Sequence, residues 1–219
     1  MIHLAPVPLL VAVVLLLIRA GFREAKKAVC FLKPTATLLV ILVAALSWRT
    51  PLSDSRYSAW LLVGLACSLA GDVALIFTSR KAFLLGLVAF MAAHVVYAVL
   101  FGAYSGFHAA DLVTGAVLLA AGVAVYRYLL PGLGGIKLPV ALYVLMICLM
   151  INRAFAAFFG EILSLTQAWL ISAGATLFWV SDLILAIHRF RRPLRYHRIG
   201  LAFYYAGQLL IALSASYFA

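Results

Sequence analysis

The chain has 219 residues, of which 67% are hydrophobic and 11% charged, whereas soluble domains hold about 45–50% apolar and about 25% charged residues. This composition excludes a soluble globular protein and indicates an integral membrane protein. The net charge of +11 comes from basic residues that flank apolar segments, so we expect it to face anionic lipid headgroups and expect no nucleic-acid partner.

Eight apolar segments approach or reach the length that spans a bilayer, about 17–25 residues. They cover residues 3–18, 34–48, 58–78, 82–104, 110–130, 138–158, 166–188 and 199–217. The second is short and needs Lys33 to reach the interface, and the first lacks the features of a signal peptide, so we expect a retained helix. The connectors are too short for another domain, the longest running from Arg19 to Lys33. We therefore predict one all-α transmembrane domain over residues 1–219, with any chemistry inside the bundle.

The basic residues alternate between the two sides of this predicted bundle. The first, third, fifth and seventh connectors carry five, two, two and five lysines or arginines, whereas the even-numbered connectors carry only Arg49 and Arg56. The positive-inside rule then predicts that both termini face outward and that the odd-numbered loops face the cytoplasm.

Two aspartates, Asp72 and Asp182, lie inside apolar segments. A carboxylate at the centre of a membrane helix costs about 2.5–3.5 kcal/mol on insertion scales, so such an acid indicates a functional site. Each precedes a basic loop by a similar number of residues, which places both about 10 Å below the cytoplasmic edge. The alternative is that each acid only fixes helix packing. The other four acids lie in or beside predicted loops and raise no such question.

The two halves of the chain resemble each other weakly. Gly71-Asp72 in the third segment corresponds to Ser181-Asp182 in the seventh, and Lys33-Pro34 to the Lys137–Pro139 stretch. An offset of four helices predicts two parallel four-helix repeats related by an axis along the membrane normal. The alternative is that apolar helices resemble one another by composition alone.

Helical spacing adds polar neighbours to this predicted site. Gly64, Ser68 and Gly71 form a small-residue stripe that allows close packing beside Asp72. The candidate substrate-binding residues are Lys33, His94, Tyr97, Asn152, Arg153, Tyr204, Tyr205 and Gln208.

Each candidate has a structural alternative. His94 is equally explained as a core histidine, the tyrosines and Gln208 as interhelical hydrogen bonds, Arg153 as a side chain reaching toward Glu161, and Lys33 as an interfacial anchor. Lys33, Arg80 or Arg189 is also a candidate to hold a phosphate.

The sequence offers no metal or nucleophile motif. Cys30, Cys67 and Cys148 are scattered, and neither cysteines nor histidines have zinc-ligand spacing. The serines near the acids lack the G-x-S-x-G context of a hydrolase nucleophile. We therefore expect no metal and no serine triad.

Five motifs in sequence order resemble the YhhN-like lysoplasmalogenase family, from about Lys33-Pro34 to Ser214. They are G-D-x-x-L at Gly71, G-L-x-x-F-x-x-A-H-x-x-Y from Gly86 to Tyr97, Tyr143 with the stretch from Met150 to Arg153, S-D-x-x-L-A at Ser181, and Y-Y-x-x-Q from Tyr204 to Gln208. The resemblance implies hydrolysis of the vinyl ether bond of lysoplasmalogen, a single-chain ether phospholipid, without metal or organic cofactor. It implies that the family's acids fall on Asp72 and Asp182.

The chemistry of a vinyl ether fits two carboxyl groups. Protonation of its β-carbon gives an oxocarbenium ion, which needs a proton donor and a stabilising anion, as in glycosidases. Burial and a neighbouring carboxylate both favour the protonated form of one acid. The pair would titrate together, and we take Asp182 as the acid and Asp72 as the stabiliser and water activator.

Two other functions use the same residues. A proton-coupled transporter or channel would use the acids as a relay, and a lipid-binding scaffold would have no turnover. Transporter sites usually lie near the midplane, whereas the shallow depth of the acids suits the glycerol end of a lipid. We expect a bacterial plasma-membrane enzyme whose active site opens toward the cytoplasmic leaflet; the sequence leaves its oligomeric state open.

Overall fold

The computed structural model describes residues 2–51 and 53–218, and within these ranges it contains helices and no strands. Eight of the helical segments are long and apolar enough to cross a membrane, so the predicted all-α transmembrane fold is confirmed. The α-helices are α1 (Val7–Phe22), α2 (Lys26–Ser47), α3 (Ser55–Ala74), α4 (Arg80–Ser105), α5 (Ala110–Leu129), α6 (Lys137–Ala156), α7 (Leu165–Phe190) and α8 (Gly200–Leu213). Short 3-10 helices cover Ile2–Leu4 (η1), Leu130–Gly132 (η2), Gly134–Ile136 (η3), His197–Ile199 (η4) and Ser214–Ser216 (η5).

Helix α2 departs from the prediction at its start. It begins at Lys26 and carries Pro34 in its interior, so the predicted connector from Arg19 to Lys33 shrinks to residues 23–25. Proline removes one backbone donor and usually marks a helix start, which is why the pattern of Lys33-Pro34 was misleading. The tyrosine hydroxyl of Tyr205 donates to the Lys33 carbonyl at 2.9 Å and ties this part of α2 to α8.

The third segment also ends earlier than predicted. Helix α3 stops at Ala74, whereas the apolar run continues to residue 78. Asp72 therefore lies in the last turn of α3, while Asp182 lies two turns before the end of α7.

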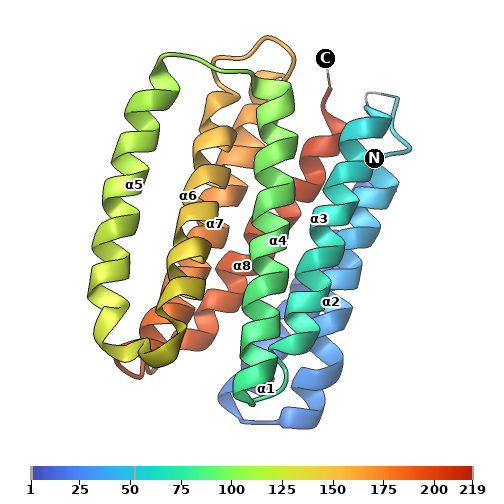
Figure 1. Cartoon of the computed structure of the whole chain (residues 1–219). Helices are drawn as coiled ribbons and strands as arrows, with labels where there is room; N and C mark the ends of the chain where they lie inside the picture. The colour runs from blue at the N-terminus through green and yellow to red at the C-terminus, as the bar shows by residue number, and fades with distance from the viewer. Residues whose placement is uncertain (1, 52, 219) are drawn as a thin grey trace.

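The packing of the first four helices recurs in the last four. Helix α1 packs on α2 as α5 packs on α6, α3 packs on α4 as α7 packs on α8, and the α4–α6 contact corresponds to the contact between α8 and α2. Figure 1 shows α5 at one side of the bundle next to α6. This recurrence supports the predicted pair of parallel repeats.

Small residues let α3 approach α4. A Cβ atom built on Gly64 would overlap the Tyr97 ring, and one on Gly71 would come within 2.7 Å of the Phe90 ring. In the second half, a Cβ on Gly174 would meet the Gly207 carbonyl oxygen at 2.8 Å. The predicted small-residue stripe is confirmed as a close helix contact.

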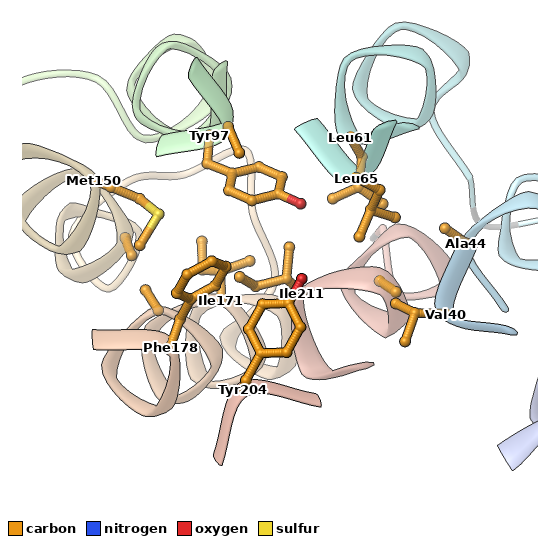
Figure 2. Packing of buried hydrophobic residues seen from close by; sticks show 14 of the residues in the cluster. Val40, Ala44, Leu61, Leu65, Tyr97, Met150, Ile171, Phe178, Tyr204 and Ile211 are labelled. Atoms are coloured by element: carbon orange, nitrogen blue, oxygen red, sulfur yellow. The ribbon is translucent and has the colours of Figure 1, made fainter. Parts of the chain in front are cut away.

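The core is aromatic at mid-bundle. Figure 2 shows Phe178 of α7 and Tyr204 of α8 next to each other, with ring centroids 5.2 Å apart in edge-to-face geometry. Phe90 of α4 packs on both rings. These rings lie between the two aspartates found in the sequence.

The start of α3 has a well-formed cap. Asp54, in the connector before α3, accepts a hydrogen bond from the Tyr57 backbone N–H at 2.6 Å, which satisfies one free donor of the first turn. The Tyr104 hydroxyl donates to the same oxygen at 2.6 Å. That hydrogen bond lowers the pKa of Asp54, because it stabilises the charged form.

Candidate functional site

Asp72 is held by three side chains from α2 and α8. Its Oδ2 atom accepts hydrogen bonds from the Thr37 hydroxyl at 2.5 Å and from the Tyr204 hydroxyl at 2.7 Å. Its Oδ1 atom lies 3.1 Å from the Lys33 ammonium nitrogen, and the Asp72 side chain is 1% exposed. A buried carboxylate is tolerated when it is paired with a cation and hydrogen bonded. The Asp72 site is therefore a compensated ion pair.

Asp182 has different partners. The Tyr143 hydroxyl donates to its Oδ2 atom at 2.5 Å, and the His94 Nε2 atom lies 3.8 Å from the same oxygen. In the part of the chain that the structure describes, neither lysine nor arginine comes within 4 Å of Asp182. Its side chain is 18% exposed, so this acid faces open space without a cation beside it.

An aromatic bridge joins the two acids, which do not bond each other directly. Tyr204, the partner of Asp72, packs on Phe178. Phe178 in turn packs on His94, with ring centroids 4.9 Å apart, and His94 packs on Tyr143 at 5.0 Å. Both carboxyl groups therefore border one buried cluster formed by α4, α6, α7 and α8.

The two acid sites occupy equivalent positions of the repeat. Asp72 and Asp182 are 110 residues apart in the sequence, and the same offset relates Lys33 to Tyr143 and His94 to Tyr204. Each aspartate thus contacts equivalent helices through equivalent positions, but Lys33 of one site is replaced by Tyr143 in the other. The repeat therefore gives two carboxyl sites with different neighbours, an ammonium group beside Asp72 and a phenol and an imidazole beside Asp182.

A cavity opens beside Asp182, which we call the apolar chamber. It encloses about 70 Å³ between α4, α5, α6 and α7, and its walls are apolar apart from Tyr143, Trp179, Asp182 and Arg189. A chamber of this character fits a hydrocarbon group next to a single acid.

A larger cavity of about 420 Å³, which we call the basic vestibule, opens beside Lys33. It lies among α1, α2, α7 and α8, and no Asp or Glu of the described residues lines it. Its charged and imidazole side chains are those of Lys33, His188, Arg189, His197 and Arg198. Leu75, Phe83, Leu185 and Arg189 line both cavities, so the two are neighbours.

Three further candidate residues connect helices around the Asp72 site: Tyr97, Gln208 and Tyr205. Tyr205 does so through its hydrogen bond to the Lys33 carbonyl. The Tyr97 hydroxyl donates to Gln208 Oε1 at 3.1 Å, and the Gln208 amide donates to the Ser68 hydroxyl at 2.8 Å. These bonds link α3, α4 and α8 one turn away from Asp72. Their contact with a substrate stays a prediction.

Asn152 and Arg153 lie at the other end of the bundle, where α4 meets α5. The Arg153 guanidinium is 2.8 Å from an Asp111 oxygen and donates to the Gly106 carbonyl at 2.9 Å, and the Asn152 amide donates to the Asp111 carbonyl at 2.9 Å. Arg153 therefore pairs with Asp111 rather than reaching toward Glu161. The structure does not bring Asn152 or Arg153 to Asp72 or Asp182. Their contact with a substrate also stays a prediction.

Asp111 lies beside a loop, as expected, but in the first turn of α5. Its side chain is buried against Arg153, because the first turn of α5 packs on α6. The sequence pattern showed only that it lay next to a predicted loop.

Tyr143 and Arg198 were not among the predicted site residues. Tyr143 was noted only as part of a family motif, and Arg198 was only counted among the five basic residues of the seventh connector. Aligning the two halves on their aspartates would have placed Tyr143 opposite Lys33. Arg198 had no such signal, because its position depends on how η4 folds back toward α1.

The described residues contain no group of three or more His, Cys, Asp or Glu arranged to hold a metal ion. The polar atoms next to the acids are hydroxyl, imidazole and ammonium groups. The site therefore offers proton transfer and charge stabilisation through its own side chains.

Comparison with known proteins gives one consistent result. The YhhN family model matches residues 28–215. Lysoplasmalogenase TMEM86A of Bos taurus is 36% identical over 160 residues, which cover 71% of this chain and 64% of that protein. Lysoplasmalogenase TMEM86B of Homo sapiens is 35% identical over 182 residues, covering 81% of this chain and 72% of that protein.

The chain thus spans less than two thirds of the length of TMEM86A, and TMEM86A of Homo sapiens gives the same 64% coverage. No solved structure matches the chain.

Proposed function

Because the chain belongs to the YhhN family, we propose that it is a membrane-embedded lysoplasmalogenase. Its substrate would be a lysoplasmalogen, and its products a fatty aldehyde and a glycerophosphocholine or glycerophosphoethanolamine. The relatives named lysoplasmalogenase support this activity. The observation that carries the proposal is the position of Asp182, an acid at the wall of an apolar chamber with no lysine or arginine of the described residues within 4 Å.

The reaction begins with a proton transfer to carbon. Asp182, in its protonated form, donates to the β-carbon of the vinyl ether and leaves an oxocarbenium ion at the α-carbon and oxygen. Asp72 takes a proton from water as the water oxygen adds to the α-carbon, which gives a hemiacetal. As the hemiacetal collapses, Asp72 returns that proton to the departing glycerol oxygen and Asp182 takes the hydroxyl proton, so that one water is consumed, the aldehyde is released and both acids regain their starting forms.

The surroundings of the two acids support this division of roles. Asp72 pairs with the Lys33 ammonium group, whereas Asp182 accepts a hydrogen bond from the Tyr143 hydroxyl. A fixed negative charge near a developing cation lowers the barrier, because such preorganised charges act strongly in a dry site. Asp72 is thus the stabilising anion and water activator, and Asp182 is the general acid.

His94 is the neighbour best placed to assist. It is fully buried, and neither ring nitrogen has a hydrogen-bond partner among the described residues. A buried polar group without a partner is costly, so a hydrogen bond to the oxygen added from water would satisfy it. We assign His94 this contact with the hemiacetal. The hydrogen bond from Tyr204 to Asp72 supports a role for Tyr204 in orienting this acid, and its contact with the substrate stays a prediction.

The basic loops indicate how the protein is oriented in the membrane and from which side its substrate enters. We propose that the end of the bundle bearing these loops faces the cytoplasm of a bacterial cell and that the lysolipid enters from the inner leaflet. The basic loops would then contact anionic lipid headgroups.

The test is an aldehyde assay on protein purified in detergent. A vinyl-ether lysophosphoethanolamine should release fatty aldehyde, while matched alkyl-ether and ester lysolipids should not, because only the vinyl ether forms a stabilised cation on carbon protonation. If the protein releases no aldehyde but carries a proton flux in sealed liposomes, the result would contradict the hydrolase and support a proton-coupled transporter.

A further inference from the structure

The basic vestibule has the size and charge of an anion-binding pocket. Its volume of about 420 Å³ falls in the range of small-molecule sites, about 300–1,000 Å³. Lys33, Arg189 and Arg198 line it without an acidic residue among the described lining side chains. Lys33 is already paired with Asp72, whereas neither Arg189 nor Arg198 has an acidic partner within 4 Å among the described residues. The charges of these two arginines repel each other unless an anion neutralises them.

Arg198 has an unsatisfied donor in this pocket. Its Nε atom is buried and has no hydrogen-bond partner in the described part of the chain. The side chain is held in place because Gly21 of α1 leaves room for it, with the Arg198 Cδ atom 3.0 Å from where a Cβ would lie. An arginine fork suits phosphate oxygens, which accept two parallel hydrogen bonds.

The loop that carries Arg198 is fixed from within. The His188 and His197 rings stack with centroids 3.6 Å apart. The Leu194 backbone N–H donates to His188 Nδ1 at 2.9 Å, and the Leu194 carbonyl lies 2.9 Å from His197 Nδ1. These contacts hold η4 over the vestibule, so Arg198 is preorganised.

The repeat explains why one cavity is basic and the other apolar. Positions related by the 110-residue offset carry Lys33 and Tyr143, His197 and Leu87, and Gly200 and Phe90, and each member lines its own cavity. Gly200 leaves open the space that a phenylalanine ring fills in the chamber. The larger, charged cavity and the smaller, apolar one are therefore divergent copies of one pocket.

We propose that the basic vestibule binds the phosphate of the lysolipid head group while the vinyl ether occupies the apolar chamber. This inference rests on the proposed function and adds a substrate-recognition site to it. Arg198 and Arg189 bind the phosphate oxygens, and Lys33 lies between the phosphate and Asp72. The cavities share Leu75 and Leu185 at their boundary, so the short glycerol unit spans the two sites.

Binding is the first test, because it does not need turnover. A 1-alkyl-ether lysophosphoethanolamine, which cannot be cleaved, is titrated into wild-type protein in detergent by calorimetry, beside 1-alkylglycerol, glycerophosphoethanolamine and inorganic phosphate. The lysophospholipid should bind at least tenfold more tightly than each of the others, since they lack either phosphate or chain. Equal binding of alkylglycerol would overturn the phosphate site, and equal binding of inorganic phosphate would indicate a free-phosphate site instead.

Variants locate the site. Arg198→Gln should weaken lysophospholipid binding about tenfold, as expected for loss of a charged hydrogen bond, and leave alkylglycerol binding unchanged. Arg192→Gln removes the same charge from the same exposed loop but does not line the vestibule, and should leave both affinities unchanged. If Arg198→Gln lowers the thermal midpoint, Arg189→Gln provides the second variant. Equal losses in the Arg192 and Arg198 variants would refute the site.

Turnover separates this inference from the proposed function. On a vinyl-ether lysophosphoethanolamine, Arg198→Gln should raise KM about tenfold with little change in kcat, and on a 1-alkenylglycerol it should change neither constant. Aldehyde release that is equally efficient for both substrates in wild type would refute the vestibule and keep the hydrolase. Tight lysophospholipid binding without aldehyde release would refute the hydrolase and keep the vestibule as a phosphate-binding site.

Discussion

The same residue type at two equivalent positions has two environments. Asp72 is compensated by Lys33 at 3.1 Å, and Asp182 by the Tyr143 hydroxyl at 2.5 Å. The difference in charge comes from the position that holds the Lys33 ammonium group in one site and the Tyr143 phenol in the other, and the position of Tyr204 holds His94 in the second site. The two carboxyl groups therefore differ in their neighbours, an ammonium group beside Asp72 and a phenol beside Asp182, and the proposed division of roles rests on this difference.

The ion pair of Asp72 gives a residue-level prediction about stability. Lys33→Met should lower the free energy of unfolding by about 3 kcal/mol, because removing one partner leaves a buried charge uncompensated. The double variant Lys33→Met/Asp72→Asn should recover most of this loss. Thermal unfolding midpoints in detergent measure both, and a double variant less stable than Lys33→Met would contradict the pairing.

At the residue level, the sequence revealed the acids and three residues that lie beside them, Lys33, Tyr204 and His94, but not which residue contacts which acid. Asp72 and Asp182 were predictable because an acid in an apolar helix is costly. Thr37 carries no such cost and gave no signal, although it bonds Asp72 at 2.5 Å. Long-range pairs such as Arg153 with Asp111 depend on which helix faces meet, and helical periodicity alone does not fix that.

The helices approach each other where side chains are absent. Gly174 of α7 and Gly207 of α8 face each other so closely that a Cβ on Gly207 would lie 2.6 Å from the Gly174 carbonyl oxygen. Gly64 of α3 receives the Tyr97 ring in the corresponding place of the first repeat. Small residues therefore set the spacing of both helix pairs, as is common in membrane bundles.

Substitution of these glycines tests the packing. Gly207→Ala should destabilise the protein by about 1–3 kcal/mol, since the backbone of α7 has to move. Gly200→Ala on the same helix is the control, because its Cβ would meet Ile184 at an ordinary 3.4 Å. The comparison of their thermal midpoints would contradict this account if the two variants were equally stable.

Helix existence was predictable and helix ends were less so. All eight spans follow from apolar length, a signal that does not depend on neighbours. The start of α2 was missed because Lys26, Lys27 and Pro34 resemble a loop followed by a helix start, although α2 extends through them. Residues 75–78 continue the apolar run of α3 outside its helix.

At the scale of the whole molecule, duplication and charge define two different ends. The α1–α2, α3–α4, α5–α6 and α7–α8 connections lie at one end, and Figure 1 shows the C-terminus at the opposite end. The lysines and arginines of the odd-numbered connectors gather at the first of these ends, as does the basic vestibule. A head group bound there would leave the rest of the lipid inside the bundle.

Orientation in the membrane can be measured directly. With Cys30, Cys67 and Cys148 replaced by serine, a cysteine at Ala109 should react with a membrane-impermeant maleimide in intact bacterial cells, and one at Pro193 should react only after lysis. The expectation follows from the positive-inside rule. Labelling of Pro193→Cys in intact cells would show the opposite orientation and contradict this prediction.

Duplication was visible in the sequence only as paired motifs. Asp72 and Asp182 set a register of 110 residues between the halves, in which Lys33 corresponds to Tyr143 and not, as predicted, to the Lys137–Pro139 stretch. Most other equivalent positions differ, because the two cavities have diverged in charge and volume. The repeat was therefore predictable from its acids, and the difference between the cavities was not.

The central claim is that Asp182 and Asp72 act together on a vinyl ether, and the most direct measurement is aldehyde release by Asp182→Asn and Asp72→Asn. Asp54→Asn is the matched control, because Asp54 lies outside the site and asparagine can also cap α3. We expect each site variant to lose about 100-fold or more of kcat per folded protein, the contribution of a general acid, and the control to keep wild-type turnover. The thermal midpoint of Asp182→Asn should stay unchanged, whereas that of Asp72→Asn should fall, because Lys33 loses its buried partner. Wild-type rates in both site variants would contradict the account.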